Sequence, residues 1–130
     1  MALTNDIRLI GHCGIAPKIL NYGHTRKFCR LPIYTEHWVR HSDGGYQRLK
    51  ELHWCLFFGK LAERAEKILL KGAMVHIRGT LHYHKFEKNG HKEIKPQILV
   101  DDFMISTQPL MTKEVYRLIY EEQVESKNGN

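Results

Sequence analysis

The residues from 74 to 86 alternate in character in a way that suits contact with a polyanion. Odd positions, from Val75 and Ile77 to Tyr83, are apolar or small and should face a core, whereas even positions, including Arg78, are polar or basic and end in an aromatic ring at Phe86. In a strand, such alternation places the two sets on opposite faces of a sheet. A solvated sheet face is the alternative, which explains the polar residues well and a ring among charges less well. Rings stack on exposed bases while Lys and Arg follow phosphates, so the pattern favours a protein that binds single-stranded nucleic acid.

A second aromatic group lies between residues 38 and 58. Trp38 precedes Arg40 and a Gly-rich loop, which makes it a better candidate for base stacking than for the core. In the run from 52 to 58, Trp54 and Phe58 share one face of a strand, but the opposite face is also apolar. A period of two does not say which face is buried, so one aromatic set can belong to the core or to a subunit interface.

The nine histidines raise the alternative of a metal-dependent enzyme. His82 and His84 could chelate a metal from one strand face, but a catalytic site needs further ligands and a positioned general base. Asp101 and Asp102 are adjacent and would point to opposite faces, and the chain has no HExxH motif. We therefore expect no catalytic residue, no metal and no cofactor. Histidines on a nucleic-acid surface would instead make binding tighten as the pH falls through about 6.5.

The elements that must position these residues are short strands and one central helix. Alternation and turn residues predict strands over 7–10, 18–20, 28–34, 52–58, 74–86 and 93–105. We expect a turn through Gly11, Gly14 and Pro17, and a bulge or strand edge at Pro32, which has no N–H for a sheet ladder. Asn89-Gly90 predicts a hairpin, and helical spacing that stops at Gly72 predicts a helix over 60–71. About five strands with one helix after the third is the layout of an OB-type barrel.

The chain is expected to form one domain over 1–109, followed by a short helix from about 113 to 125 and a frayed end. The net charge is +6, and the tail from 110 to 130 holds three Lys or Arg and four Glu, so the positive excess lies in the domain. A basic domain suggests a polyanionic partner, because phosphate neutralisation releases counterions. Charge alone does not separate DNA from RNA or from an acidic membrane surface.

Several features bear on the compartment. No segment approaches the length of a membrane span, and the first residues lack the basic and apolar regions of a signal peptide. The three cysteines are scattered and form no CxxC motif, which argues against a disulfide framework or a zinc ribbon. We therefore expect a cytoplasmic protein without membrane contact, whose cysteines act as small hydrophobic residues.

Two stretches carry a family resemblance. Residues 56–63 read LFFGKLAE, and residues 70–81 read LKGAMVHIRGTL. They closely resemble the FGKLAE-like stretch, the KG turn and the V-x-I-x-G-x-L strand of the bacterial single-stranded DNA-binding protein family. The resemblance covers residues 5–106 and implies an all-β fold, a five-stranded OB-fold barrel. It also implies a nucleoid-associated homotetramer that coats single-stranded DNA, with little sequence preference, during replication, recombination and repair.

The resemblance further implies which rings stack on bases. Trp38, Phe58 and Phe86 fall on aromatic positions that do so in typical members. Leu52 departs from the pattern, because a typical member has tryptophan there. Trp54 lies two residues on, hence on the same strand face, and we hypothesise that it takes over this role. Each stacked ring should contribute about 1–3 kcal/mol to binding.

The resemblance also implies roles for basic residues and for one histidine. Lys60 and Lys71 match basic positions near phosphates, and we add Arg40 and Arg78 as phosphate contacts. His53 matches a histidine that family members place at a subunit contact. Because several phosphates would be neutralised, affinity should fall steeply with salt.

The carboxyl end departs from the family pattern. Typical members continue into a flexible tail whose acidic-hydrophobic tip recruits replication and repair proteins, whereas this chain ends in KNGN. Recruitment by that route is therefore not expected. A primosome-type adaptor and an RNA-binding OB domain remain alternatives, since both use a similar barrel and stacking tolerates any base.

Overall fold

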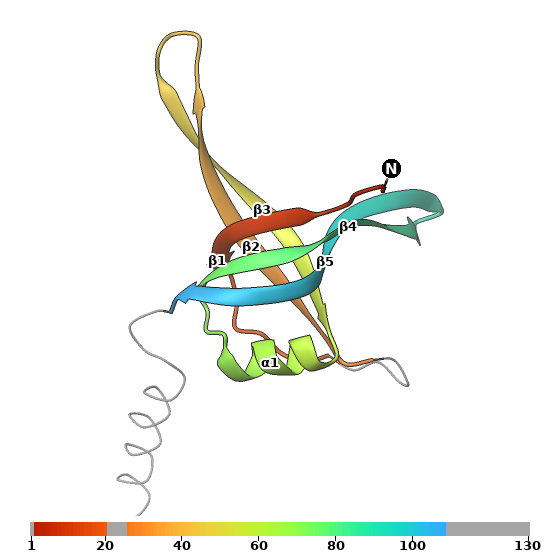
Figure 1. Ribbon diagram of the computed structural model, residues 1–130. Helices are drawn as coiled ribbons and strands as arrows, with labels where there is room; N and C mark the ends of the chain where they lie inside the picture. The colour runs from red at the N-terminus through yellow and green to blue at the C-terminus, as the bar shows by residue number, and fades with distance from the viewer. Residues whose placement is uncertain (1, 21–25, 109–130) are drawn as a thin grey trace, which may run out of the picture.

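The computed structural model describes residues 2–20 and 26–108 of the chain. Its elements follow in the order β1 (Ile7–Cys13), β2 (Phe28–Arg40), β3 (Tyr46–Phe58), α1 (Lys60–Ile68), β4 (Met74–Lys88) and β5 (His91–Thr107). The strands close into a barrel in the order β1-β2-β3-β5-β4 (Figure 1). The predicted five-stranded barrel with a helix after the third strand is thus confirmed. The predicted helix over 113–125 lies outside the described residues.

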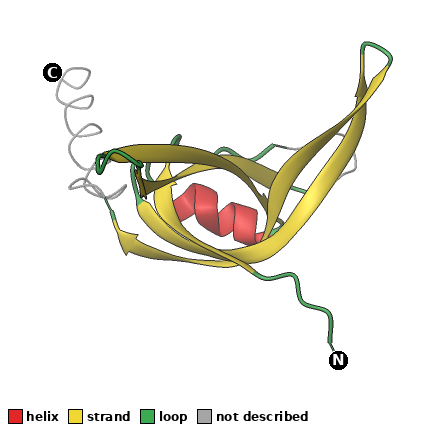
Figure 2. Cartoon of the chain, turned by 90° about the horizontal axis from the view of Figure 1, so that it is seen from above, coloured by secondary structure: helices red, strands yellow, loops and turns green. Residues whose placement is uncertain are grey.

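The barrel closes because β1 and β5 each join two neighbours. β1 pairs antiparallel with both β2 and β4, and β5 pairs antiparallel with β4 but parallel with β3. Viewed from above, the strands form a ring with α1 inside its outline, since the helix covers one end of the barrel (Figure 2). At Gly79 an added Cβ would lie 2.3 Å from the Leu99 carbonyl oxygen, so this close approach of β4 to β5 requires glycine.

The core decides which face of each strand is inside. In β3 the odd residues Cys55 and Phe57 are fully buried, so Trp54 and Phe58 face outward. The helix adds Ala62, Ala65 and, just beyond its end, Leu69 to the same core. Burial raises the pKa of the Cys55 thiol to about 12, with a smaller effect of Cys13. All three cysteines are free and buried, as expected of small hydrophobic residues.

Two hairpin arms extend from the barrel (Figure 1). One is formed by β2 and β3, paired one to one from Phe28↔Phe58 to Arg40↔Tyr46, and the other by the far ends of β4 and β5. In both arms the strands are longer than predicted. Neither face of an arm is buried, so the alternation of apolar and polar residues that predicts a strand is weaker there. Tyr83 was expected in the core but is 55% exposed, since it lies on the second arm beyond the barrel.

Several local expectations were wrong. Gly11 continues β1, so of the expected turn residues only Gly14 and Pro17 lie beyond the strand, and the predicted strand over 18–20 is a single bridge from Leu20 to Phe28. The helix ends at Ile68, three residues before the predicted end. Pro32 causes no bulge; its carbonyl accepts a hydrogen bond from Gly14 N–H at 2.9 Å, where pairing with β1 has just ended. No backbone N–H donor is needed at this position, which agrees with the expected strand edge and not with the expected bulge.

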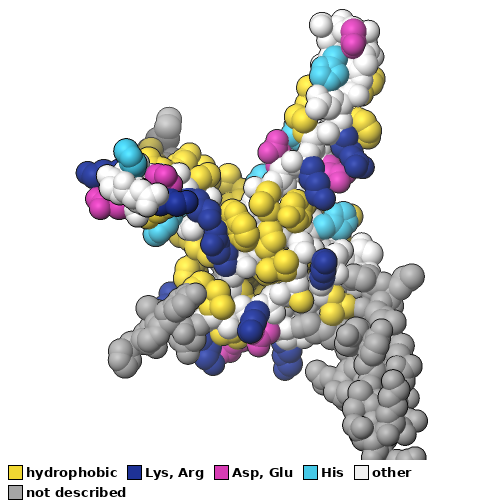
Figure 3. Space-filling view, turned by 180° about the vertical axis from the view of Figure 1, so that it is seen from behind, with side chains coloured by type: hydrophobic (Ala, Val, Ile, Leu, Met, Phe, Trp, Pro, Cys, Tyr) yellow, Lys and Arg dark blue, Asp and Glu magenta, His cyan; other side chains and the backbone are white. Residues whose placement is uncertain are grey.

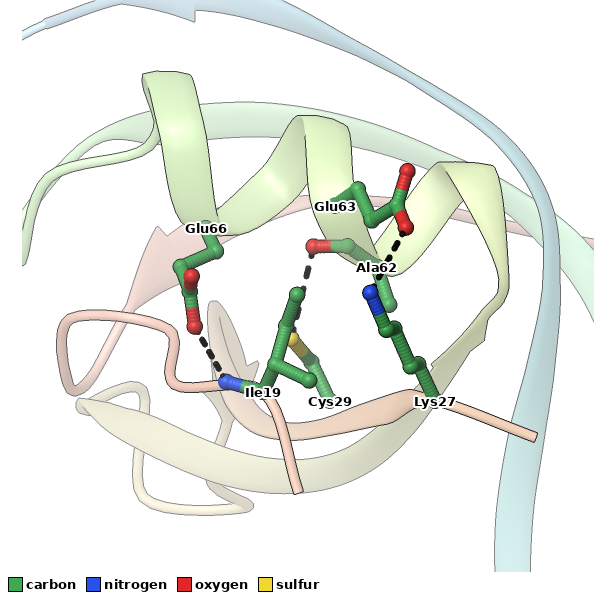
Figure 4. A network of polar contacts seen from close by, with 6 residues as sticks. All are labelled: Ile19, Lys27, Cys29, Ala62, Glu63 and Glu66. Atoms are coloured by element: carbon green, nitrogen blue, oxygen red, sulfur yellow. Dashed lines mark hydrogen bonds and ion pairs between the residues drawn. The ribbon is translucent and has the colours of Figure 1, made fainter. Parts of the chain in front are cut away.

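Polar contacts connect α1 to Ile19 and to the beginning of β2 (Figure 4). Lys27 Nζ lies 3.3 Å from Glu63 Oε1, and the Cys29 thiol donates to the Ala62 carbonyl. Glu66 accepts a hydrogen bond from the backbone N–H of Ile19. Because Lys27 and Cys29 point toward the helix, the alternate residues between and beside them point outward.

Candidate nucleic-acid interface

A groove of about 1220 Å³ crosses the outer face of β2, β3, β5 and β4. Seen from behind, hydrophobic side chains gather between the two arms, with Lys and Arg side chains around them (Figure 3). Three rings and three cations among its lining residues are central to its chemistry. They are Phe28, Phe58, Phe86, Arg26, Arg30 and Lys95.

The rings come together through strand register. Phe28 lies directly opposite Phe58 in the β2/β3 ladder, and their centroids are 6.2 Å apart at a tilt of 36°. Phe86 lies on the outer face of β4, where its ring stacks on His84 with centroids 5.7 Å apart. Both ring pairs line the same groove, which therefore offers apolar faces to planar ligands.

The three cations lie beside aromatic rings, one of them at Phe58 and two at Trp54. The Arg26 guanidinium is 5.6 Å from the Phe58 centroid, and Arg30 and Lys95 are 4.2 and 5.2 Å from the Trp54 centroid. None of these three cations takes part in an ion pair with another described residue. One carboxylate, Asp101, also lines the groove. The groove wall thus combines aromatic faces with cations that pair with no carboxylate of the described residues, an arrangement suited to bases and phosphates.

The predicted rings fall into two regions. Phe58 and Phe86 line the groove, and Trp54 lies beside it under two cations. Trp38 lies instead on the β2–β3 arm, opposite Arg48, and is 67% exposed. It is six residues along β2 from the partner of Trp54, a span of about 20 Å at the usual rise per residue.

None of the four predicted phosphate contacts lines the groove. Arg40 lies at the far end of β2, and Lys60 is exposed at the start of α1. Lys71 lines a second hollow of about 480 Å³ on the side of β1. Arg78 forms an ion pair with Asp6 at 3.5 Å, on the face where β4 meets β1.

Sequence reasoning missed Phe28, Arg26, Arg30 and Lys95. Phe28 and Arg30 are alternate residues of β2, and Arg26 continues the same spacing just before the strand, so the parity that drew attention to residues 74–86 would have grouped them. Lys95 could have been found from the Asn89-Gly90 turn, because counting outward from it sets Lys95 opposite His84.

His53 faces away from the groove. Its Nε2 lies 2.8 Å from the Thr35 hydroxyl, within the β2/β3 pair. Burial lowers the pKa of His53 below its ordinary value, against a smaller opposing effect of the Glu51 carboxylate. A neutral imidazole in a hydrogen bond is therefore favoured here, which suits a structural position.

Two further observations concern other classes of site. Within residues 2–20 and 26–108, no group of three or more His, Cys, Asp or Glu side chains could hold a metal ion. The described part of the chain also contains no helix that is long and apolar enough to cross a membrane.

Comparisons with known proteins place this groove in context. A single-stranded DNA-binding protein of Xylella fastidiosa is 29% identical over 102 residues, which cover 78% of this chain and 62% of that protein. A Plasmodium falciparum SSB in complex with ssDNA has a TM-score of 0.75 at 21% identity, covering 82% of this chain and 98% of that one.

A deletion mutant of the single-stranded DNA binding protein from Thermus aquaticus has a TM-score of 0.72 at 20% identity, covering 84% of this chain and 53% of that one. These two structures share the barrel fold. The family model described as "Single-strand binding protein family" matches residues 4–106. With its barrel, its groove of rings and cations, and this match over most of its length, the chain belongs to the single-strand binding protein family.

Proposed function

We propose that this chain binds single-stranded DNA with little sequence preference and catalyses no reaction. Bases stack on Phe58 and Phe86 in the groove, with Phe28 beside them, and phosphates are neutralised by groove cations. Every base has a flat face, so such stacking does not select a sequence. In this role the protein would protect exposed strands in the cytoplasm, near the nucleoid, during replication, recombination and repair.

The observation that carries this proposal is the coexistence, in one groove, of rings and cations that form no ion pair within residues 2–20 and 26–108. Arg26, Arg30 and Lys95 are not neutralised by a carboxylate of the described residues. A surface cation that is kept beside a ring without an anion is well placed to receive one from a ligand. The names of the similar proteins from Xylella and Plasmodium point to the same ligand.

Beyond the groove, we propose that the strand continues along the β2–β3 arm. Trp38 and Arg40 lie on one face of that arm, since both are even residues of β2. Lys60 and Lys71 would meet phosphates that leave the groove on its other sides. Arg78 should contribute least, because a phosphate must compete there with Asp6.

We also propose that the protein is a homo-oligomer, with a tetramer as the expected state. Within the described residues, β1 pairs with β2 only at His12 and Cys13, which leaves one edge of Ile7–Ile10 open for strand addition. Ile10 on β1 and Met104 on β5 are 58% and 61% exposed and line one hollow on the side of the barrel formed by β1, β4 and β5. His53 would belong to a contact between subunits. Light scattering should give a mass of several chains, and a monomer would contradict the proposal.

The proposed ligand is tested by fluorescence anisotropy of a labelled oligo-dT at several salt concentrations. We expect binding that weakens as salt rises, and much weaker binding of a duplex of equal length, whose bases are not open to the rings. Absence of binding to oligo-dT at low salt would contradict the proposal. Tighter binding of oligo-rU than of oligo-dT would contradict DNA as the preferred ligand.

A further inference from the structure

Trp54 differs from the other rings of the groove in its surroundings. Arg30 reaches it from β2 and Lys95 reaches it from β5, the two strands that flank β3. Their charged groups lie 4.2 and 5.2 Å from the indole centroid, inside the distance of about 6 Å over which a cation is attracted to a ring. By comparison, Phe58 has one cation within reach and Phe86 contacts an imidazole. A base that stacked on an indole face covered by either cation would have to displace that cation.

A second observation at Arg30 also favours an anion as its ligand. Its Nε is buried and has no hydrogen-bond partner among the described residues. A buried donor without a partner costs free energy, and more so on a charged group. The guanidinium fork suits a phosphate, which can accept two parallel hydrogen bonds. Arg30 thus contacts the Trp54 ring and has an Nε–H donor that no described residue accepts.

We propose that Trp54 is a positioning residue that holds Arg30 and Lys95 in the groove for phosphates, and that bases stack elsewhere. This inference rests on the proposed binding of single-stranded DNA. It assigns Trp54 a different role from the stacking hypothesised for it from its place near Leu52. Long Lys and Arg side chains lose conformational freedom when they bind, and a ring that orders them beforehand reduces that cost.

The contact itself is tested without DNA. In a Trp38→Phe protein, Trp54 is the only tryptophan, and acrylamide quenching reports its accessibility. We expect Arg30→Gln and Lys95→Gln each to increase quenching, because each removes a group that covers the indole. An Arg48→Gln control on the arm should leave quenching unchanged. Unchanged quenching in both groove variants would overturn the proposal, and this result does not depend on DNA binding.

The role is tested by the salt dependence of oligo-dT binding. For single strands, log K falls with log salt by about 0.7 for each neutralised phosphate. Trp54→Leu should reduce that slope by up to about 1.4, as for the loss of two phosphate contacts. Trp54→Phe keeps a ring and should keep most of the slope. In the Trp54→Leu background, a further Arg30→Gln change should have a smaller effect than in the unaltered protein.

A stacking residue behaves differently, so Phe86→Leu is the matched control, because among the described residues no Lys or Arg lies over the Phe86 ring. It should lower affinity without changing the slope. If Trp54→Leu also lowers affinity at an unchanged slope, Trp54 stacks on a base and the proposal is wrong. If both affinity and slope are unchanged, Trp54 has no part in binding and the proposal is equally wrong. Failure of the unaltered protein to bind would instead contradict the proposed function, which separates the two claims.

Discussion

The groove and the opposite side of the barrel both contain cations, but the neighbours of these cations differ. In the groove, Arg26, Arg30 and Lys95 lie beside rings and form no ion pair with other described residues. On the other side, Arg78 pairs with Asp6 at 3.5 Å and Arg64 on α1 pairs with Asp102 at 3.4 Å. The neighbours of a cation, more than its place on a strand, therefore decide whether it is available to a phosphate.

β4 shows this within a single strand. Arg78 and Phe86 are both even residues and both face outward, but the first half of β4 pairs with β1 and the second half only with β5. The outer face of the strand thus passes from one side of the barrel to the other. Alternation identifies the outward residues, and the pairing partners identify the surface to which they belong.

The largest difference between the two sides should come from the rings. Phe58→Ala and Phe86→Ala should each weaken oligo-dT binding by about 1–3 kcal/mol, or roughly 5- to 150-fold, because a stacking face is lost. Tyr83→Ala is the matched control, since this exposed ring lies on the other face of the same arm. Anisotropy titrations measure all three. An equal loss in the Tyr83 variant would contradict the assignment of the groove.

The next difference should come from the cations. Arg26→Gln removes a groove cation and should reduce the salt slope of binding by about 0.7. Arg64→Gln removes a cation that is paired with Asp102 and should leave the slope unchanged. Titrations of the two variants over the same salt series compare them directly. Equal slopes would mean that carboxylate pairing does not distinguish the two sides.

A smaller effect is expected from His84, which lines the groove and stacks on Phe86. His84→Ala removes the imidazole that packs against the Phe86 ring, so oligo-dT binding should weaken, but by less than it does when either phenyl ring is lost. Anisotropy titrations measure the effect. Unchanged affinity in this variant would exclude His84 from the binding surface.

The smallest effect concerns stability rather than binding. Burial lowers the pKa of His53 in the folded protein, so the unfolded chain takes up its proton first as the pH falls. Stability contributed by neutral His53 is therefore present above about pH 6.5 and is lost as the pH falls below that value. Thermal unfolding of the His53→Gln variant should depend less on pH than that of the unaltered protein. An unchanged dependence would mean that His53 is not responsible.

Much of the barrel was predictable because its core strands obey a simple alternation. Val75 and Ile77 are buried as expected, and the Asn89-Gly90 turn joins β4 to β5. The two arms were not predictable, since residues such as Tyr83 have no buried face against which to alternate. The inward face of β3 was also undecided, because both faces are apolar and only the closed barrel shows that Phe57 is inside.

The candidate site was predictable in part. Phe58 and Phe86 line the groove, whereas Lys71 and Arg78 lie on other surfaces. Sequence proximity to a ring was a poor guide to cations, since Arg30 and Lys95 reach Trp54 from strands distant in sequence. Which cations surround a ring depends on cross-strand register, and for β3 and β5 that register follows from barrel closure.

The central claim is that single-stranded DNA lies across the groove between the two arms. It is tested most directly by ultraviolet cross-linking of an oligo-dT that carries 5-iododeoxyuridine, with the attached peptides identified by mass spectrometry. We predict cross-links at Phe58 and Phe86, because the modified base must lie against a ring to react. Cross-links confined to β1 and to residues 102–104, on the opposite side of the barrel, would contradict the account.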